Sequence, residues 1–219
     1  MCIKDIATVA VKRNSKWIIF DVMGVIFEVG DITNDLLVPF IQKRNDTISA
    51  EKINEMYLRA SLGEISSFDF WKELGFRSEY PEIEREYLDA YLTIDPDFIE
   101  TARTLVKNYY LAMLSNDVKE WSAYLRAKFD LNSLFKIIII SGEVGYRKPD
   151  KRIYNILLER IQSSPSNCVF IDDRAKNLLA ASEMGIKTIR FIREDGYFPA
   201  GFEISSFAEL PRVIERAFE

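Results

Sequence analysis

The stretch "WIIFDVMGVIFEVG", residues 17–30, decides the fold of this chain. Large apolar residues at 17–20 lead into a single aspartate, Asp21, and Gly24 follows three residues later. A charge at the end of a buried strand is costly unless it has a partner or a function. The stretch therefore predicts a buried strand that carries Asp21 to a functional site.

Four more apolar runs resemble this first one and predict further strands. They are rich in β-branched and aromatic residues and do not alternate with polar ones, which is typical of parallel strands covered on both faces. Helical patterns separate the later runs, so we expect an α/β fold with a Rossmann-like, doubly wound parallel sheet. The expected strands are 17–20, 109–114, 135–140, 168–171 and 187–192.

Residues 31–95 differ from the rest of the chain because they contain no candidate strand. Their pattern predicts helices only, and Ser49 and Ser66 are suitable N-caps. An all-helical block inserted after the first strand suggests a cap over the active face. We therefore expect a core domain of residues 1–30 and 96–219 and a cap domain of residues 31–95. The expected cap helices are 33–43, 49–60, 66–74 and 81–92.

The composition narrows the class of protein. The 219 residues are 48% hydrophobic and 29% charged, which suits a globular core. The net charge of −5 argues against a nucleic-acid partner, and no run reaches the roughly 18 apolar residues of a membrane span. Without a recognisable signal peptide, we expect a cytoplasmic monomer or homodimer.

Residue types missing from the sequence also exclude some chemistry. The chain has no histidine, which excludes Ser-His-Asp and Cys-His catalysis and argues against a zinc site. Its two cysteines, Cys2 and Cys168, are predicted to be free thiols. The remaining candidates are carboxylates, lysine, hydroxyls, amides and a metal bound by oxygen.

Polar residues follow the predicted strands at the ends where ligands bind in open α/β sheets. Each alone has an ordinary explanation, such as capping a turn or a helix. Together, and in this order, they predict one site. They are Asp21, Ser115, Asn116, Lys148, Asp172 and Asp173.

The chemistry of this set is coherent. Three carboxylates at one point repel one another unless a cation joins them, and Mg²⁺ prefers such oxygen ligands. With Lys148 and the Ser115 hydroxyl, the positive charge would suit a dianion such as phosphate. Asp21 could then attack phosphorus and form an aspartyl phosphate.

Four short segments carry a resemblance to a known family: "FDVMGVIF", "LSN", "GYRKPD" and "FIDDRAKN". In kind and order they resemble the four motifs of the haloacid dehalogenase-like hydrolases, which are α/β proteins with a cap. "SFDFWKELG" and "KPDKRIYNILLERI" are similar to the branch that contains the N-terminal phosphatase domain of soluble epoxide hydrolase.

The resemblance implies a role for each site residue. Asp21 would be the nucleophile and Lys148 would neutralise the transferring group, which Ser115 and Asn116 would bind. Asp173 would bind Mg²⁺ directly and Asp172 through water, with Asn177 supporting their loop. The other two metal ligands would be the Asp21 side chain and the backbone carbonyl of Met23.

Met23 is the one departure from the family pattern. Phosphatases of the family usually have a second aspartate there, which protonates the leaving group and later activates water. Methionine can do neither, although its carbonyl can still bind a metal. The sequence therefore predicts a Mg²⁺-dependent phosphatase on a small phosphorylated metabolite with reduced acid–base catalysis.

Several alternatives remain open. A 2-haloacid dehalogenase also lacks the second aspartate, but needs no metal and would leave the Asp172–Asp173 pair without a function. A weakened phosphate- or partner-binding module is another possibility. A phosphonate-cleaving relative would need a cap lysine, and the lysines there suit solvated helix faces better. A receiver domain has its acidic pair first in the chain, whereas here the pair comes last.

The cap is expected to select the substrate, but its sequence does not identify one. Tyr57, Arg59, Phe68 and Trp71 are candidates to face the site. Packing is the commoner function of such aromatic residues, and Arg59 is expected to be solvated.

Overall fold

The computed structural model describes residues 15–193 and 201–219. Within these residues, six parallel strands form one sheet in the order β3-β2-β1-β4-β5-β6. The predicted α/β fold with a parallel sheet is confirmed. The strands are β1 (Trp17–Phe20), β2 (Tyr110–Ser115), β3 (Ile137–Ile140), β4 (Cys168–Asp172), β5 (Lys187–Phe191) and β6 (Phe202–Ile204).

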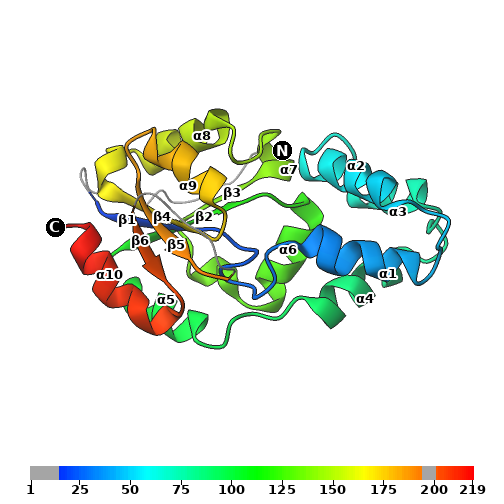
Figure 1. Ribbon diagram of the computed structural model, residues 1–219, viewed down its shortest axis with the longest axis horizontal. Coiled ribbons are helices and arrows are strands. Elements are labelled where there is room, and N and C mark those ends of the chain that lie inside the picture. Colours follow the sequence, from blue (N-terminus) through cyan, green and yellow to red (C-terminus); the bar gives the residue numbers. More distant parts are fainter. Residues whose placement is uncertain (1–14, 194–200) are drawn as a thin grey trace, which may run out of the picture.

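The sheet is covered on both faces, as the continuous apolar runs predict. In β1, Ile18 and Phe20 pack in one hydrophobic core, and Trp17 and Ile19 pack in the other. Figure 1 shows α8 and α9 over one face and α5 and α10 over the other. These four helices are α5 (Phe98–Leu105), α8 (Lys151–Ile161), α9 (Ala175–Ser182) and α10 (Leu210–Ala217).

The helices between β1 and α5 form the part of the molecule to the right in Figure 1. Ser49 and Ser66 cap two of them, as predicted, by accepting hydrogen bonds from the backbone N–H groups of Lys52 and Asp69. The first predicted helix begins as a π-helix whose N-cap is Asp31. The helices are η1 (Ile32–Leu37), α1 (Val38–Gln42), α2 (Ala50–Ser61), α3 (Ser67–Glu73) and α4 (Glu82–Tyr91).

Short elements connect the remaining strands. One of them, α7, lies beside the end of α2 and also contacts α6 (Figure 1). Three single-turn 3₁₀-helices complete the described chain. These elements are α6 (Lys119–Lys128), α7 (Ser141–Val144), η2 (Leu131–Ser133), η3 (Pro165–Asn167) and η4 (Phe207–Glu209).

The helical segment packs closely against the sheet-bearing part of the chain. The Ser141 hydroxyl donates a 2.6 Å hydrogen bond to the carbonyl of Ser61 at the end of α2. A Cβ atom on Gly63 would lie 2.4 Å from the carbonyl oxygen of Gly142, so only glycine fits this close approach. The division into a core and a cap domain stays a prediction, and its first 14 residues lie outside the described ones.

Some details of the sequence prediction differ from the structure or fall outside it. β6 was not predicted, because three residues at a sheet edge give too short a pattern to detect. Cys168 is a buried free thiol, whereas Cys2 lies outside the described residues. In the part of the chain that the structure describes, no helix is long and apolar enough to cross a bilayer.

Candidate active site

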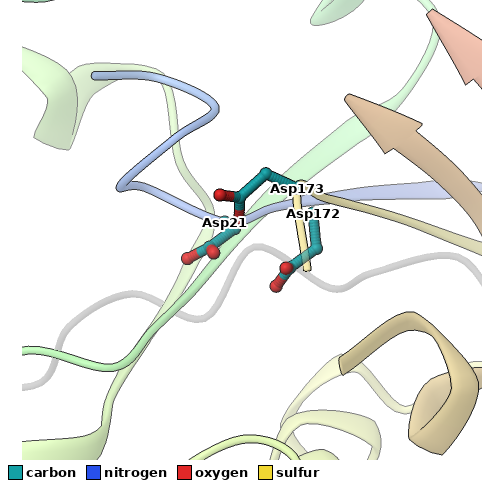
Figure 2. Close-up of side chains that lie close together, drawn as sticks. All are labelled: Asp21, Asp172 and Asp173. Carbon is teal, nitrogen blue, oxygen red and sulfur yellow. The ribbon is translucent and has the colours of Figure 1, made fainter. Parts of the chain in front are cut away.

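Three carboxylates meet where the strand order reverses, between β1 and β4. Asp21 follows β1, Asp172 ends β4, and Asp173 comes directly after it. One oxygen from each of the three lies within 4.8 Å of the others. Figure 2 shows the three side chains close together, contributed by these two neighbouring strands. The predicted convergence is therefore present, because parallel strands end at the same edge of a sheet.

Lys148 lies between two of these carboxylates. Its Nζ is 2.7 Å from Oδ1 of Asp21 and 2.8 Å from Oδ2 of Asp172. Burial alone would lower the pKa of the Lys148 ammonium, but Asp172 and Asp21 outweigh it and raise that pKa above its ordinary value. The lysine therefore stays charged in a buried site.

Asp21 has its two hydrogen bonds on the same oxygen. Within the described residues, the Lys148 ammonium and the Val22 N–H both donate to Oδ1, the second at 2.6 Å. Burial and the neighbouring Asp172 raise the pKa of Asp21 well above its ordinary value, against the opposing effect of Lys148. This arrangement fixes the carboxyl group and leaves Oδ2 outside both contacts.

Asp172 is completely buried and fully hydrogen-bonded. Its Oδ1 accepts from the Arg174 N–H at 2.8 Å, and Oδ2 accepts from Lys148. The Asn177 amide also donates to both oxygens, at 3.1 and 3.0 Å. Asn177 thus contacts the loop that it was expected to support, and Asp172 holds Lys148 and this loop together.

Asp173, unlike Asp172, has an oxygen without a hydrogen-bond donor. Its Oδ1 is buried and accepts no hydrogen bond from the described residues. Burial, and next the charge of Asp172, raise the pKa of Asp173 to about 6. A buried carboxylate oxygen without a donor is costly, so this oxygen and the surrounding acidic cluster fit a divalent cation.

Gly24 makes room for Asp173. A Cβ atom on Gly24 would lie 2.3 Å from Oδ2 of Asp173, and its φ of +80° is unfavourable for other residues. Gly30 approaches the same oxygen, since a Cβ atom there would lie 2.5 Å away. The two glycines of the opening stretch therefore hold the loop against the acidic cluster.

Ser115 ends β2 beside the cluster and Asn116 follows it, but their side chains make different contacts. The Ser115 hydroxyl is buried and has no hydrogen-bond partner among the described residues. The Asn116 amide donates to the Lys148 carbonyl at 2.9 Å and accepts from the Lys148 N–H at 2.8 Å. Asn116 therefore positions Lys148, a function that the sequence did not indicate.

A cavity of about 540 Å³ opens onto this site. Asp21, Met23 and Lys148 line it from the sheet, and residues of η1 and α2 line the opposite side. The Met23 side chain is 7% exposed and carries no group that could donate a proton. The cavity is thus large enough for a small ligand and adjoins the predicted nucleophile.

Two arginines also line the cavity, and the sequence reasoning missed both. Arg147 precedes Lys148, and its guanidinium donates to the Ser61 hydroxyl of α2. Arg174 follows Asp173 and donates to the carbonyl of Gly30 at 2.9 Å. Their position beside motif residues was the available signal, because such neighbours share the same sheet edge.

Of the four cap residues that were candidates to face the site, one lines the cavity. Tyr57 lines the cavity, and its hydroxyl donates to the Asn116 carbonyl at 3.3 Å. Arg59 pairs with Glu64 at 3.6 Å with 42% of its side chain exposed, as expected for a solvated residue. Phe68 packs against Tyr80, and Trp71 is buried among other aromatic residues.

A parallel sheet whose carboxyl edge gathers a buried lysine and three aspartates defines an α/β protein with a candidate catalytic site at that edge. A comparison of the sequence with protein families agrees with this geometry. The family model of the haloacid dehalogenase-like hydrolases matches residues 15–185. The chain therefore belongs to this hydrolase family.

Relatives within the family include dehalogenases and phosphatases. The chain is 28% identical to (S)-2-haloacid dehalogenase 1 of Pseudomonas sp. (strain CBS-3), over 68% of this chain and 70% of that protein. It is 24% identical to D-ribitol-5-phosphate phosphatase of Bacteroides thetaiotaomicron, over 80% and 91% respectively.

The resemblance to the epoxide hydrolase branch is also confirmed, over a shorter region. Bifunctional epoxide hydrolase 2 of Mus musculus is 42% identical over 60 residues, which cover 27% of this chain and 11% of that protein. Among solved structures, an enzyme of the haloacid dehalogenase-like (HAD) family from Bacteroides thetaiotaomicron superimposes on this chain with a TM-score of 0.71. That pair is 20% identical and covers 84% of this chain and 96% of the other, which supports the fold.

Proposed function

We propose that this hydrolase is a Mg²⁺-dependent phosphatase that acts on small phosphomonoesters through an aspartyl phosphate on Asp21. The observation that carries the proposal is the buried Asp173 oxygen without a donor, beside Asp21 and Asp172. A dehalogenase would leave this oxygen without a function. A phosphatase that binds a divalent cation there would use it.

Each residue of the site would have a separate role in phosphoryl transfer. Oδ2 of Asp21 attacks phosphorus, while Lys148 neutralises charge on the phosphoryl oxygens. The Ser115 hydroxyl, which is buried and unpartnered, can donate to one of those oxygens. The Asn116 side chain keeps Lys148 in place by hydrogen-bonding the Lys148 backbone. The backbone N–H of Asn116 can contribute to binding of the phosphoryl group.

The acidic cluster would hold the metal through Asp21, Asp173 and the Met23 carbonyl, with Asp172 acting through water. Bound Mg²⁺ supplies positive charge against the phosphate and relieves repulsion among the carboxylates. Asp172 suits the indirect role because both of its oxygens already accept hydrogen bonds.

The second candidate function is dehalogenation of a 2-haloacid. Met23 favours it, because attack on carbon needs no acid for the departing halide. The relative from Pseudomonas sp. is named as such a dehalogenase. Asp173 weighs against it, because its charge would repel Asp21 and Asp172 without a metal and its buried oxygen has no donor among the described residues.

The size and position of the cavity and the net charge of the chain support proposals about the substrate, the partners and the compartment. We propose a small phosphorylated metabolite, because the cavity is about 540 Å³ and lies between the two proposed domains, 1–30 with 96–219 and 31–95. The net charge of −5 favours neither nucleic acid nor an anionic membrane as a partner. A monomer or homodimer in the cytoplasm suits this function.

A substrate panel tests the proposal. The protein is assayed with phosphorylated sugars, polyols and acids and with 2-haloacids, each with Mg²⁺ and with a chelator. Phosphate release that needs Mg²⁺ and disappears in Asp21→Asn is the expected result. Halide release that persists with the chelator would establish the dehalogenase instead. A protein that binds phosphate but turns over neither class would be a binding module.

A further inference from the structure

We infer that the hydroxyl of Tyr57 is the proton donor for the leaving group, in place of the aspartate that Met23 replaces. This inference rests on the proposed phosphatase function. It concerns a residue of α2, which lies 36 positions after the nucleophile and belongs to none of the four family motifs.

The chemistry requires a donor from somewhere. An alkoxide leaving a phosphate ester is strongly basic, and general acid catalysis typically contributes about 10²–10⁴ in rate. Met23 lines the cavity beside Asp21 but has no transferable proton. A side chain that replaces the aspartate as donor must therefore lie on the wall of the same cavity.

The acidic groups on the cavity wall are poorly suited, among the residues that the structure describes. Asp31 is occupied at the start of η1, where it accepts from the N–H and the side-chain amide of Asn34. Glu55 is exposed and pairs with Lys52 at 3.3 Å. Glu51 is fully exposed, and hydrogen bonds lower its pKa, so it carries no proton at neutral pH.

Tyr57 carries a buried phenol on the wall opposite the sheet, where Thr33 offers only a much less acidic alcohol. Its side chain is 6% exposed, and its hydroxyl lies 3.3 Å from the carbonyl of Asn116, the residue after Ser115. That hydrogen bond is long for an O–H donor, for which about 2.7–2.8 Å is usual. The proton can therefore be redirected to a leaving oxygen without losing a strong bond.

The ring of Tyr57 is held in place. It stacks on Trp121 with a centroid distance of 5.9 Å and an interplanar angle of 30°. The Arg147 guanidinium lies 5.5 Å from the ring centroid on the cavity side. A donor fixed in this way loses little entropy in the transition state.

The charges around Tyr57 suit both of its protonation states. Burial and the nearby Asp117 raise the pKa of Tyr57, so the hydroxyl keeps its proton at neutral pH. Arg147 acts in the opposite direction and would stabilise the phenolate left after donation.

Tyr57 gives up one proton when the aspartyl phosphate forms and regains one when it is hydrolysed. Oδ2 of Asp21 bonds to phosphorus as the ester P–O bond breaks, and the leaving oxygen takes the proton of Tyr57. The Tyr57 phenolate then takes a proton from water as the water oxygen attacks phosphorus. The P–O bond to Asp21 breaks, its electron pair returns to the carboxylate, and the tyrosine is restored.

The test is Tyr57→Phe in the full chain, assayed with Mg²⁺ on two esters. An alkyl phosphate needs its leaving group protonated, whereas 4-nitrophenyl phosphate does not. We expect kcat/KM to fall ten-fold or more on the alkyl ester and less than about three-fold on the aryl ester. Protein acid-quenched during reaction with the aryl ester should also hold more aspartyl phosphate, because the base for water is lost while formation is nearly unchanged.

Tyr87→Phe is the matched control. Tyr87 is also buried, donates to a backbone carbonyl at 3.2 Å and packs on Trp121 at 5.4 Å, but it lies outside the cavity wall. This variant should retain the activity on both esters. Adding Met23→Asp to Tyr57→Phe should restore activity on the alkyl ester, because it supplies a new acid.

Other results would overturn the inference. Equal losses on both esters would mean that Tyr57 only shapes the cavity, and no loss beyond that of Tyr87→Phe would remove it from the reaction. If the unmodified protein forms no aspartyl phosphate and releases no phosphate from any ester, the proposed function itself is wrong. That outcome is distinct, because it does not depend on the residue at position 57.

Discussion

The ammonium nitrogen of Lys148 lies 2.7 Å from Oδ1 of Asp21, and both side chains are almost completely buried. The same nitrogen also holds Asp172 at 2.8 Å. A buried charge pair contributes little when intact, but removing one partner leaves an uncompensated charge. The stability of the site therefore depends on a charge balance that single substitutions can disturb.

Removing the lysine charge should destabilise the fold in a pH-dependent way. Without Lys148, the pKa of Asp21 would rise further above its unfolded value, so stability is lost as the pH increases. We expect Lys148→Met to lower the free energy of unfolding by about 3 kcal/mol at pH 8 in a chelator, and by less at pH 5. Urea denaturation at the two pH values measures this.

An exposed lysine provides the control for that experiment. Lys151 pairs with Glu183 at 2.7 Å, but more than half of each side chain is exposed. Lys151→Met should cost at most about 1 kcal/mol at either pH. Similar losses in the two lysine variants would contradict the importance that we assign to burial.

Magnesium should raise the melting temperature, because a ligand that binds only the folded state stabilises it. Without metal, the pKa of Asp173 is raised to about 6, so protons compete with the cation below that pH. The increase in Tm should therefore be larger at pH 8 than at pH 5. Differential scanning fluorimetry with and without Mg²⁺ gives this comparison.

Asp173→Asn should remove most of the Mg²⁺-dependent increase in Tm at pH 8. Asp117→Asn is a suitable control, because Asp117 is buried nearby but is not part of the acidic cluster. Its response to Mg²⁺ should match that of the unmodified protein. An undiminished response in Asp173→Asn would place the metal elsewhere.

Met23→Asp should increase phosphatase activity on poor leaving groups. The new carboxyl group would line the cavity beside Asp21 and could act as an acid. We expect a gain of about ten-fold on alkyl phosphates, below the usual 10²–10⁴ because the surroundings are not shaped for a carboxylate. Nitrophenyl phosphate should respond much less. Initial rates on both esters measure the effect.

Met23→Asn distinguishes the effect of proton donation from the effect of side-chain shape. Asparagine has nearly the form of aspartate but cannot serve as the acid, so this variant should show no gain. A matching gain in both variants would mean that polarity at this position, rather than proton transfer, limits the rate.

Asp117 should reduce stability at alkaline pH. One of its oxygens accepts from the Val118 N–H at 2.7 Å, and the other is buried without a partner among the described residues. Burial raises its pKa to about 7, against the opposing effects of the Val118 hydrogen bond, Arg147 and Arg126. Because the folded-state pKa is raised, this group costs stability as the pH rises from its ordinary value of 3.8 through 7.

The comparison of the unmodified protein with Asp117→Asn isolates this effect. Between pH 5 and pH 8, the unmodified protein should lose about 2 kcal/mol more unfolding free energy than the variant. Urea titrations at several pH values give the difference, and parallel stability curves would show that Asp117 stays protonated or is paired in both conditions.

Much of the site was predictable because parallel strands end at one edge. The apolar runs located β1, β2 and β4 to within a residue, and Asp21, Lys148 and the Asp172–Asp173 pair came together as expected. The function of Asn116 in binding the Lys148 backbone was not predictable, since it depends on a hydrogen bond across 32 residues. Tyr57 was one of four candidates from the sequence, and only the packing of α2 distinguished it from the others.

The sequence by itself determined the family, the order of the motifs along the chain and the residue types at the sheet edge. These depend on local apolar patterns and short motifs, which tolerate variation elsewhere in the chain. Only the tertiary structure decided which oxygens are already hydrogen-bonded, which one is left without a donor, and which side chains close the cavity. Those features arise from distances between elements far apart in the chain, and such distances are set by packing rather than by any local pattern.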